Sequence, residues 1–283
     1  MGVIFLKIIY LGTGASEAVP AMFCQCKVCE TARKNLGKEY RNRSGVVING
    51  TLLIDVPPDI FNSSIRAGID MTEIRDIFIT HSHSDHCDAY ELSARASRVT
   101  AYRTESGNFT THVYGNQKVK EKLSIPENIK ELDYNYIEPF KTYEIYGNIS
   151  VTPLLTTHMK DEECYIYLID NNNKRFLYGN DTGLFPEPTM KYLQNMYVDV
   201  ISLDCTYVMM KSEYGHMGID ANYKLKNLLI KQKTADEKTV FIAHHFSHNG
   251  FFPDGRYYSL DEFEQISGVY GFKVSYDAMT IDI

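Results

Sequence analysis

The chain has 283 residues, of which 44% are hydrophobic and 23% are charged. This composition is ordinary for a globular enzyme and argues against intrinsic disorder. Lys and Arg total 29 and Asp and Glu total 36, so the formal net charge is −7. An acidic chain disfavours nucleic acid as its main partner, because proteins hold the phosphate backbone through positive charge.

The first residues are typical of a buried strand and not of a targeting signal. The apolar run contains Lys7, ends at Gly12 and follows no basic segment. No stretch approaches the roughly 20 apolar residues that a membrane span requires. The chain also has no low-complexity linker. We therefore expect a cytoplasmic protein with one domain, residues 1–283, and no membrane contact.

The first half of the chain predicts strands separated by turns and two helices. Apolar runs bounded by turn residues predict strands over Leu6–Leu11, Gly45–Ile48, Thr51–Asp55 and Asp76–Thr80. Asn49-Gly50 predicts a hairpin between the second and third of these strands. Helical composition covers Ile60–Ala67 and Asp88–Ser97. The polar, Tyr- and Lys-rich stretch Val99–Glu138 is interpreted as a loop or a flap over the site.

The second half of the chain also predicts strands separated by turns, together with two helices. The predicted strands are Ser150–Thr156, Tyr165–Asp170, Arg175–Tyr178, Val198–Leu203, Val240–Ala243 and Phe272–Tyr276. The predicted helices are Met190–Met196 and Ile219–Lys233. Strands in two groups, each followed by helices, predict an α/β protein with two stacked sheets and outer helices.

The strongest chemical signal is His81-Ser-His83-Ser-Asp85-His86, directly after an apolar strand. Side chains of an extended segment alternate, so His81 and His83 point the same way and can share a metal. If the chain then turns into a helix, Asp85 and His86 reach the other side of the same pocket. Three histidines and an aspartate at this spacing therefore predict ligands for two adjacent metals.

Later strands supply further candidate ligands. His158, Asp181 and His245 each follow an apolar run, where a sheet delivers side chains to one rim. Each is weak alone, because a strand-terminal Asp is often a turn former. Their order after the first motif makes the set informative.

The ordered series resembles the metallo-β-lactamase superfamily over nearly the whole chain. The resemblance implies a four-layer αβ/βα sandwich. It also implies that His81, His83 and His158 hold one metal, that Asp85, His86 and His245 hold the other, and that Asp181 bridges them. Asp55 matches a strand-end aspartate that lies beside the site in that superfamily.

A closer resemblance is to the phosphoribosyl cyclic phosphate phosphodiesterases of the carbon–phosphorus lyase pathway. It is carried by Leu11-Gly-Thr-Gly-Ala-Ser16, by Cys24-Gln-Cys26-Lys-Val-Cys29 and by His245-Phe-Ser-His248. The resemblance implies that Cys24, Cys26, Cys29 and His248 form a structural zinc site, since a closed Cys₃His set suits structural zinc. The chain departs from that family in Asn249–Gly268 and around Thr104–Thr111, so the natural substrate stays open.

A further histidine, His216 in Tyr214-Gly-His216-Met-Gly, matches an active-site histidine of those phosphodiesterases. Its implied role is to act as a general acid or to orient the phosphate; a solvated loop histidine is the competing interpretation. Together with Asp85 it is a candidate catalytic residue. His112 and His244 have no evident partner, and Cys87 is interpreted as core packing.

The sequence therefore predicts a metal-dependent hydrolase with two Zn²⁺, Mn²⁺ or Fe²⁺ ions in the active site and one structural zinc. The expected activity is that of a phosphodiesterase, in which hydroxide generated at the paired metals attacks a small, cyclic phosphodiester. The alternatives are a transfer-RNA 3′-processing nuclease, a lactonase, or a non-catalytic binding protein like the pyrroloquinoline-quinone biosynthesis member. The oligomeric state stays open, a homodimer included.

Overall fold

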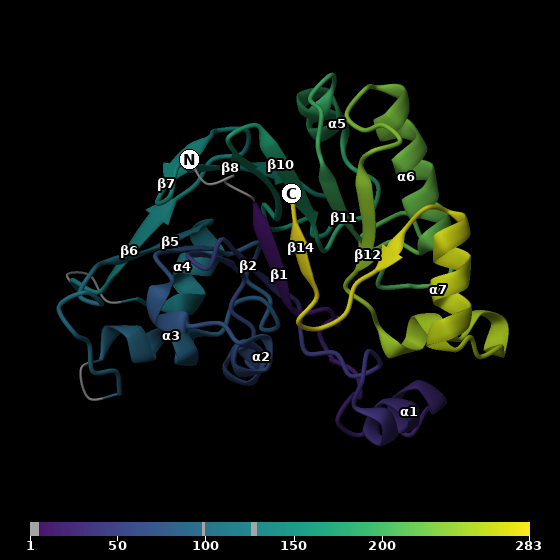
Figure 1. Cartoon of the computed structure of the whole chain (residues 1–283), viewed down its shortest axis with the longest axis horizontal. Helices are drawn as coiled ribbons and strands as arrows, with labels where there is room; N and C mark the ends of the chain where they lie inside the picture. The colour runs from purple at the N-terminus through teal and green to yellow at the C-terminus, as the bar shows by residue number, and fades with distance from the viewer. Residues whose placement is uncertain (1–5, 98–99, 126–128) are drawn as a thin grey trace.

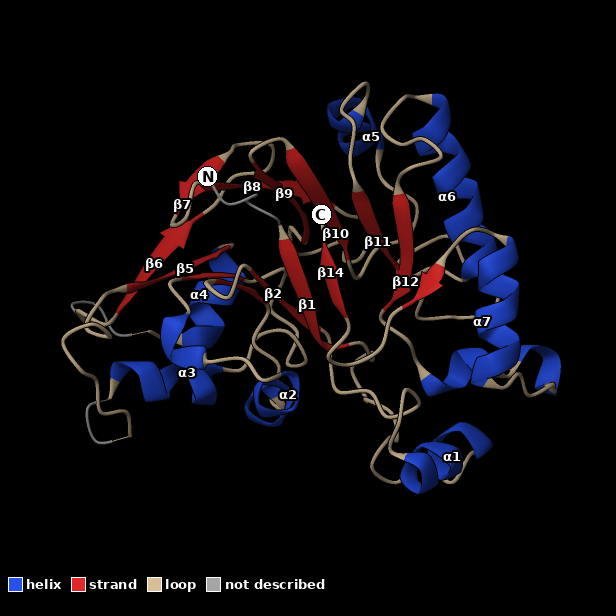
Figure 2. Cartoon of the chain, viewed as in Figure 1, coloured by secondary structure: helices blue, strands red, loops and turns tan. Residues whose placement is uncertain are grey.

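The computed structural model describes residues 6–97, 100–125 and 129–283. Within these residues, fourteen strands form two seven-stranded sheets. Figure 1 shows the sheets in the middle of the molecule with helices on both sides, and Figure 2 separates strands from helices by colour. No helix in this described part is long and apolar enough to cross a membrane.

The first sheet has the order β14-β1-β2-β3-β4-β5-β6. Its strands are β1 (Lys7–Gly12), β2 (Gly45–Ile48), β3 (Leu52–Ile54), β4 (Asp76–Phe78), β5 (Thr111–Gly115), β6 (Leu132–Tyr136) and β14 (Thr280–Asp282). Strands β3 to β6 pair in parallel. The helices packed on its outer face are α2 (Ile60–Ala67), α3 (Ala89–Ala96) and α4 (Gln117–Leu123).

The second sheet has the order β13-β12-β11-β10-β9-β8-β7. Its strands are β7 (Tyr143–Ile145), β8 (Ile149–Leu155), β9 (Tyr165–Asn171), β10 (Lys174–Gly179), β11 (Val200–Asp204), β12 (Val240–His244) and β13 (Lys273–Val274). Strands β10 to β13 pair in parallel. Its outer face packs against α5 (Glu187–Leu193), α6 (Ile219–Lys231) and α7 (Leu260–Val269). Helix α1 (Lys27–Asn35) adds Val28 and Ala32 to the same hydrophobic core and contacts the segment after β12.

Alternation of side chains along the strands builds the layers. In β1, Ile8 and Tyr10 join the core between the two sheets, whereas Ile9 and Leu11 join the core under α2 to α4. Such strands are apolar on both faces because both faces are covered. The predicted four-layer αβ/βα sandwich is therefore confirmed.

The interpretation of Val99–Glu138 as a loop or flap was wrong for its described part. That stretch contributes β5, α4 and β6, and β5 and β6 extend the first sheet in parallel register. The burial of β5 alternates along Thr111–Gly115, and Asn116 caps α4 by accepting a hydrogen bond from the Val119 amide. Short strands rich in Tyr and polar residues hid this pattern in the sequence.

Four other α-helices and β-strands were not predicted: α1, β7, α7 and β14. For α7 a sequence signal was available, because Ser259 and Glu262 form a capping box at its first turn. The short strands β7 and β14 lie at sheet edges, where pairing and not local pattern defines them.

The chain leaves several strands at the same rim of the sandwich, and three of the turns there are tight. Asp55 after β3, Asp181 after β10 and His245 after β12 have φ of 65°, 44° and 63°. This left-handed region costs roughly 1–3 kcal/mol for a residue other than glycine. The fold therefore holds the backbone at these three residues in a conformation that is unfavourable for an isolated chain.

Candidate metal centre

Three histidines from two loops form the first cluster at this rim. One side-chain nitrogen from each of His81, His83 and His158 lies within 4.8 Å of the other two. His83 Nδ1 is 3.3 Å from His158 Nε2. His81 is buried, whereas His83 is exposed at the mouth. The structure thus brings together the three residues predicted to hold the first metal.

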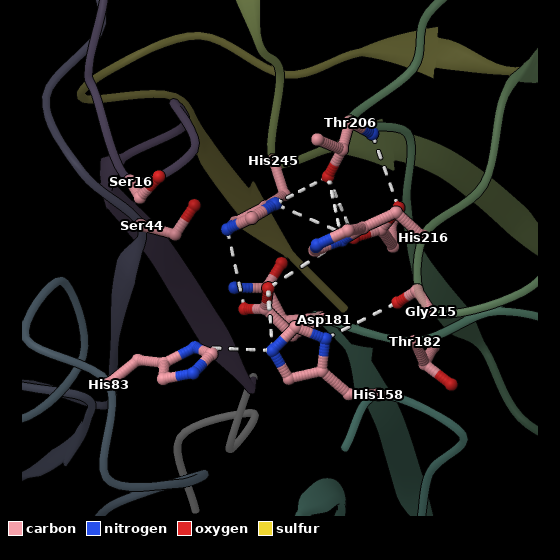
Figure 3. Close-up of polar contacts among 12 residues, drawn as sticks. Ser16, Ser44, His83, His158, Asp181, Thr182, Thr206, Gly215, His216 and His245 are labelled. Carbon is pink, nitrogen blue, oxygen red and sulfur yellow. Dashed lines mark hydrogen bonds and ion pairs between the residues drawn. The ribbon is translucent and has the colours of Figure 1, made fainter. Parts of the chain in front are cut away.

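The second cluster lies beside the first and contains Asp85, His86 and His245, whose ligand atoms also lie within 4.8 Å of one another. Asp181 stands between the clusters. Its Oδ2 is 2.8 Å from His86 Nε2 and 3.3 Å from His245 Nε2, and its Oδ1 is 3.9 Å from His158 Nε2. Figure 3 shows His158 and His245 on either side of Asp181. The position of Asp181 suits a bridging ligand.

The polar atoms of this site fit a metal pair. Among the described residues, Nε2 of His81, His86 and His245 and Oδ2 of Asp181 are buried without a hydrogen-bond partner. The 2.8 Å contact of Asp181 with His86 is an ion-pair distance without hydrogen-bond geometry. Buried polar atoms in native proteins are nearly always satisfied, so these atoms point to bound ions. Imidazole and carboxylate ligands suit Zn²⁺, Mn²⁺ or Fe²⁺.

Opposite charges face one another in the second cluster. Burial opposes the ionised form of Asp181, but the positive charges of His245 and His86 outweigh burial and keep its pKa well below the usual range. Burial likewise opposes the charged form of His86, yet the carboxylates of Asp181, Asp85 and Asp55 raise its pKa well above the usual range. A metal ion binds the deprotonated imidazole, so metal binding at this site would release protons.

Outer hydrogen bonds fix the orientation of the second cluster. Asp55 Oδ2 lies 2.7 Å from His86 Nδ1, and Asp55 Oδ1 accepts hydrogen bonds from the amide and hydroxyl of Thr80. Thr206 Oγ1 lies 2.7 Å from His245 Nδ1. In both histidines Nδ1 is engaged, which leaves Nε2 directed at the centre. Asp55 therefore lies beside the site, as the resemblance implied.

His216 stands at the edge of the second cluster and is paired with a buried carboxylate. His216 Nδ1 is 2.9 Å from Asp204 Oδ2, and its ring stacks on His245 with centroids 5.8 Å apart. The amide of Met217 donates to Asp204 Oδ1 at 2.8 Å. Burial opposes the charged imidazole of His216, but Asp204 outweighs burial and raises its pKa to about 9. His216 is therefore held against the site and is not a freely solvated loop residue.

Asp204 was missed in the sequence, although it ends β11 in the same way that other site residues end or follow strands. Burial would raise the pKa of Asp204, but the positive charge of His216 outweighs burial and lowers it to about 2. The sequence signal that could have identified Asp204 is its position at the end of an apolar run that forms a strand.

A separate thiol cluster joins the N-terminal loop to the segment after β12. Ligand atoms of Cys24, Cys26, Cys29 and His248 all lie within 4.8 Å of one another. His248 Nδ1 is 3.3 Å from Cys26 Sγ and 3.5 Å from Cys24 Sγ. The amide of Ala21 faces Cys29 Sγ at 3.3 Å. Four such ligands match a structural zinc site; that they bind zinc stays a prediction.

The two histidines without an assigned role lie outside these clusters. His244 is buried, with Nδ1 3.1 Å from Ser275 Oγ and Nε2 3.4 Å from Tyr178 Oη. His112 lies 3.3 Å from Asp133 on an exposed part of the first sheet. Cys87 is buried in the core under α2 to α4, as predicted.

Solved structures share this architecture. A diphosphatase of the PhnP family matches with a TM-score of 0.70 and 21% identity over 98% of each chain. The metallo-β-lactamase fold protein YhfI from Bacillus subtilis matches with a TM-score of 0.71 and 13% identity over 99% of this chain and 100% of its own. Zinc-bound PqqB from Methylobacterium extorquens reaches 0.73 at 16% identity, over 98% of this chain and 100% of its own. The chain thus has the metallo-β-lactamase fold, as the sequence predicted.

The particular family follows from the sequence itself. A family profile described as anti-Pycsar protein Apyc1 matches residues 38–235, well over half of the chain, and the chain belongs to that family. This stretch contains the paired clusters except His245, together with Asp204 and His216, but not the thiol cluster.

Two curated relatives match shorter stretches. An octanoyltransferase from Porphyromonas gingivalis is 33% identical over 85 residues, which are 29% of this chain and 16% of that protein. The exodeoxyribonuclease YycJ from Bacillus anthracis is 27% identical over 119 residues, which are 42% of this chain and 40% of that protein. The chain therefore spans less than half of either relative.

Proposed function

We propose that this chain is a metal-dependent phosphodiesterase that hydrolyses a small, cyclic phosphodiester. The observation that carries the proposal is the placement of His216, paired through Nδ1 with Asp204, beside the two clusters that flank Asp181. A proton donor beside a paired-metal site suits the hydrolysis of a phosphate ester, because the alkoxide leaving group needs a proton.

The ligand sets proposed for the two ions are those described above: His81, His83 and His158 for one, Asp85, His86 and His245 for the other, with Asp181 shared. When bound, the paired ions would activate water and neutralise charge on the phosphoryl oxygens. We further propose that Cys24, Cys26, Cys29 and His248 hold a structural zinc.

The protein's own groups then have separate tasks. Asp204 holds Nδ1 of His216, which leaves Nε2 to donate a proton to the leaving oxygen. Gly215 presents its carbonyl oxygen 3.4 Å from His158 Nδ1 and so orients that imidazole toward the cluster. Because both His158 and His216 depend on the loop around Gly215, ligand and proton donor are positioned together.

A cyclic, small substrate is supported by the motif resemblance to phosphoribosyl cyclic phosphate phosphodiesterases. The likeness to the PhnP-family diphosphatase, at 21% identity, concerns the fold alone. A second candidate, a nuclease, is favoured by the match to the YycJ exodeoxyribonuclease. The net charge of −7 counts against a long polyanion.

The deciding experiment is a substrate panel with metal-loaded protein. It compares an aryl phosphodiester, a ribosyl cyclic phosphate, a cyclic nucleotide, a lactone and single-stranded DNA. We expect turnover of cyclic phosphodiesters that disappears after treatment with a chelator and returns when metal is added. Turnover of DNA or lactone without cyclic phosphodiesters would replace the proposal by one of its alternatives, and metal binding without any turnover would favour a binding protein.

A further inference from the structure

A carboxylate outside the ligand sets connects the two loops of the three-histidine cluster. Glu162 lies four residues after His158, and its side chain reaches Ser82, the residue between His81 and His83. The Ser82 amide donates to Glu162 Oε1 at 2.8 Å, and the Ser82 hydroxyl donates to Glu162 Oε2 at 2.7 Å. Each carboxylate oxygen therefore accepts a hydrogen bond from Ser82.

Helix α4 supports this contact from behind. Asn116, its N-cap, donates from Nδ2 to Glu162 Oε1 at 2.8 Å and to the Glu163 carbonyl at 2.7 Å. Lys122 of the same helix donates to the Ser82 carbonyl at 2.5 Å and to Ser84 Oγ at 3.1 Å. The amide, hydroxyl and carbonyl of Ser82 are thus all engaged, which fixes the backbone on both sides of it.

From this geometry we infer that Glu162 is a positioning residue that pre-organises the subsite of His81, His83 and His158 by acting through Ser82. The inference rests on the proposed function, because it assigns these histidines to a metal. Hydrogen bonds to a carboxylate are stronger than those between neutral groups. Glu162 is therefore suited to fix the conformation of the turn that carries His81 and His83.

The second subsite has its own supports. His86 is oriented by Asp55, and His245 is oriented by Thr206. The side-chain hydrogen bonds recorded for Glu162 among the described residues go to Ser82 and Asn116. Loss of Glu162 should therefore weaken one of the two paired ions and spare the other. A general loss of stability would not produce such a difference.

The test compares Glu162→Ala, Glu162→Gln and Ser82→Ala with the matched control Asp161→Ala. Asp161 is on the same loop and carries the same charge, but its partner is the exposed Lys118. Each protein is titrated with Co²⁺ against a competing chelator, and the visible spectrum and stoichiometry are followed. The Co–thiolate absorption separately reports the Cys₃His cluster. Melting temperatures are recorded for every variant.

We expect Glu162→Ala to bind one ion of the pair about 10- to 100-fold more weakly, the range for residues that orient metal ligands, with the other ion and the thiolate band unchanged. Glu162→Gln and Ser82→Ala should fall between this variant and the wild type, because each keeps part of the contact. Asp161→Ala should behave like the wild type.

Equal weakening of both ions, unchanged affinities, or the same loss in Asp161→Ala would overturn the inference. If Glu162→Ala does not fold, Glu162→Gln and Ser82→Ala decide it, since unchanged affinities in both would refute it. A wild-type protein that binds no paired ions would instead refute the proposed function.

Discussion

His245 and His248 are three residues apart in one segment, yet they face different clusters. His245 Nε2 lies 3.3 Å from Asp181 in the paired site, whereas His248 Nδ1 lies 3.3 Å from Cys26 Sγ. Cys24 and Cys26 come from the loop before α1 and Cys29 from its first turn, more than two hundred residues earlier in the chain. Metal in the thiol cluster would therefore clip the N-terminal loop to the segment that delivers His245.

This relationship predicts that Cys26→Ser damages folding more than chemistry. A structural zinc contributes on the order of 10 kcal/mol in small zinc peptides, and less is expected in a domain with its own core. Elemental analysis should give about three metals per wild-type chain and about two in the variant, with a lower melting temperature. An unchanged melting temperature, or free native thiols and a single metal in the wild type, would contradict the structural-zinc assignment.

Asp181→Ala should lower the occupancy of the paired site and abolish turnover of every substrate. Asp181 is the one carboxylate in contact with His86, His158 and His245 among the described residues, so its loss affects both subsites. Metal content and rates on an aryl phosphodiester provide the measurement. Retention of both metals with full activity would remove Asp181 from the ligand set.

His216→Ala should leave the metals in place. Its effect on the rate should depend on the leaving group of the substrate. If Nε2 protonates the leaving oxygen, the rate should fall by about 10²–10⁴ for an alkyl leaving group and little for p-nitrophenolate, which leaves without a proton. Asp204→Asn should show the same selectivity, because Asp204 holds Nδ1 of His216. Equal losses for both leaving groups would assign His216 to phosphate positioning, and loss of metal would make it a ligand.

Stability should depend on pH through Asp277, a buried residue that belongs to none of the ligand sets. Its carboxylate accepts hydrogen bonds from Thr13 Oγ1 and the Asn42 amide, but burial outweighs them and raises its pKa to about 6 from 3.8. The folded state thus keeps a proton between about pH 4 and pH 6 that the unfolded state has lost. The free energy of unfolding contributed by this residue therefore falls as pH rises through that window, and stays constant above it.

A pKa difference of about 2 corresponds to about 3 kcal/mol. The check is denaturant unfolding of the wild type and Asp277→Asn between pH 4 and pH 7, both in chelator so that metal release does not contribute. The stability of the wild type relative to the variant should drop between pH 4 and pH 6. A difference that is flat with pH, or that grows as pH rises, would show that Asp277 titrates normally in the folded protein.

The sequence by itself determined the fold class and most of the candidate ligands. Apolar runs that end in His or Asp placed His81, His158, Asp181 and His245 at strand ends, and the layers followed from two groups of strands. These signals are local, since period-two burial and the residue after a strand can be read from neighbouring positions. The capping box at Ser259 was equally local and was overlooked.

Only the tertiary structure decided the contacts that orient the ligands. Asp204 contacts His216 across a loop, and Glu162 accepts hydrogen bonds from Ser82, which lies eighty residues earlier in the sequence. Nothing in the neighbourhood of Glu162 separates it from Asp161 and Glu163, because all three are acidic residues of one surface loop. What distinguishes Glu162 is the parallel pairing of β4, β5 and β6, which brings Asn116 and Lys122 of α4 against the ligand turn. Such long-range pairing has no local signature, so the role of this carboxylate emerges only when the sheet is assembled.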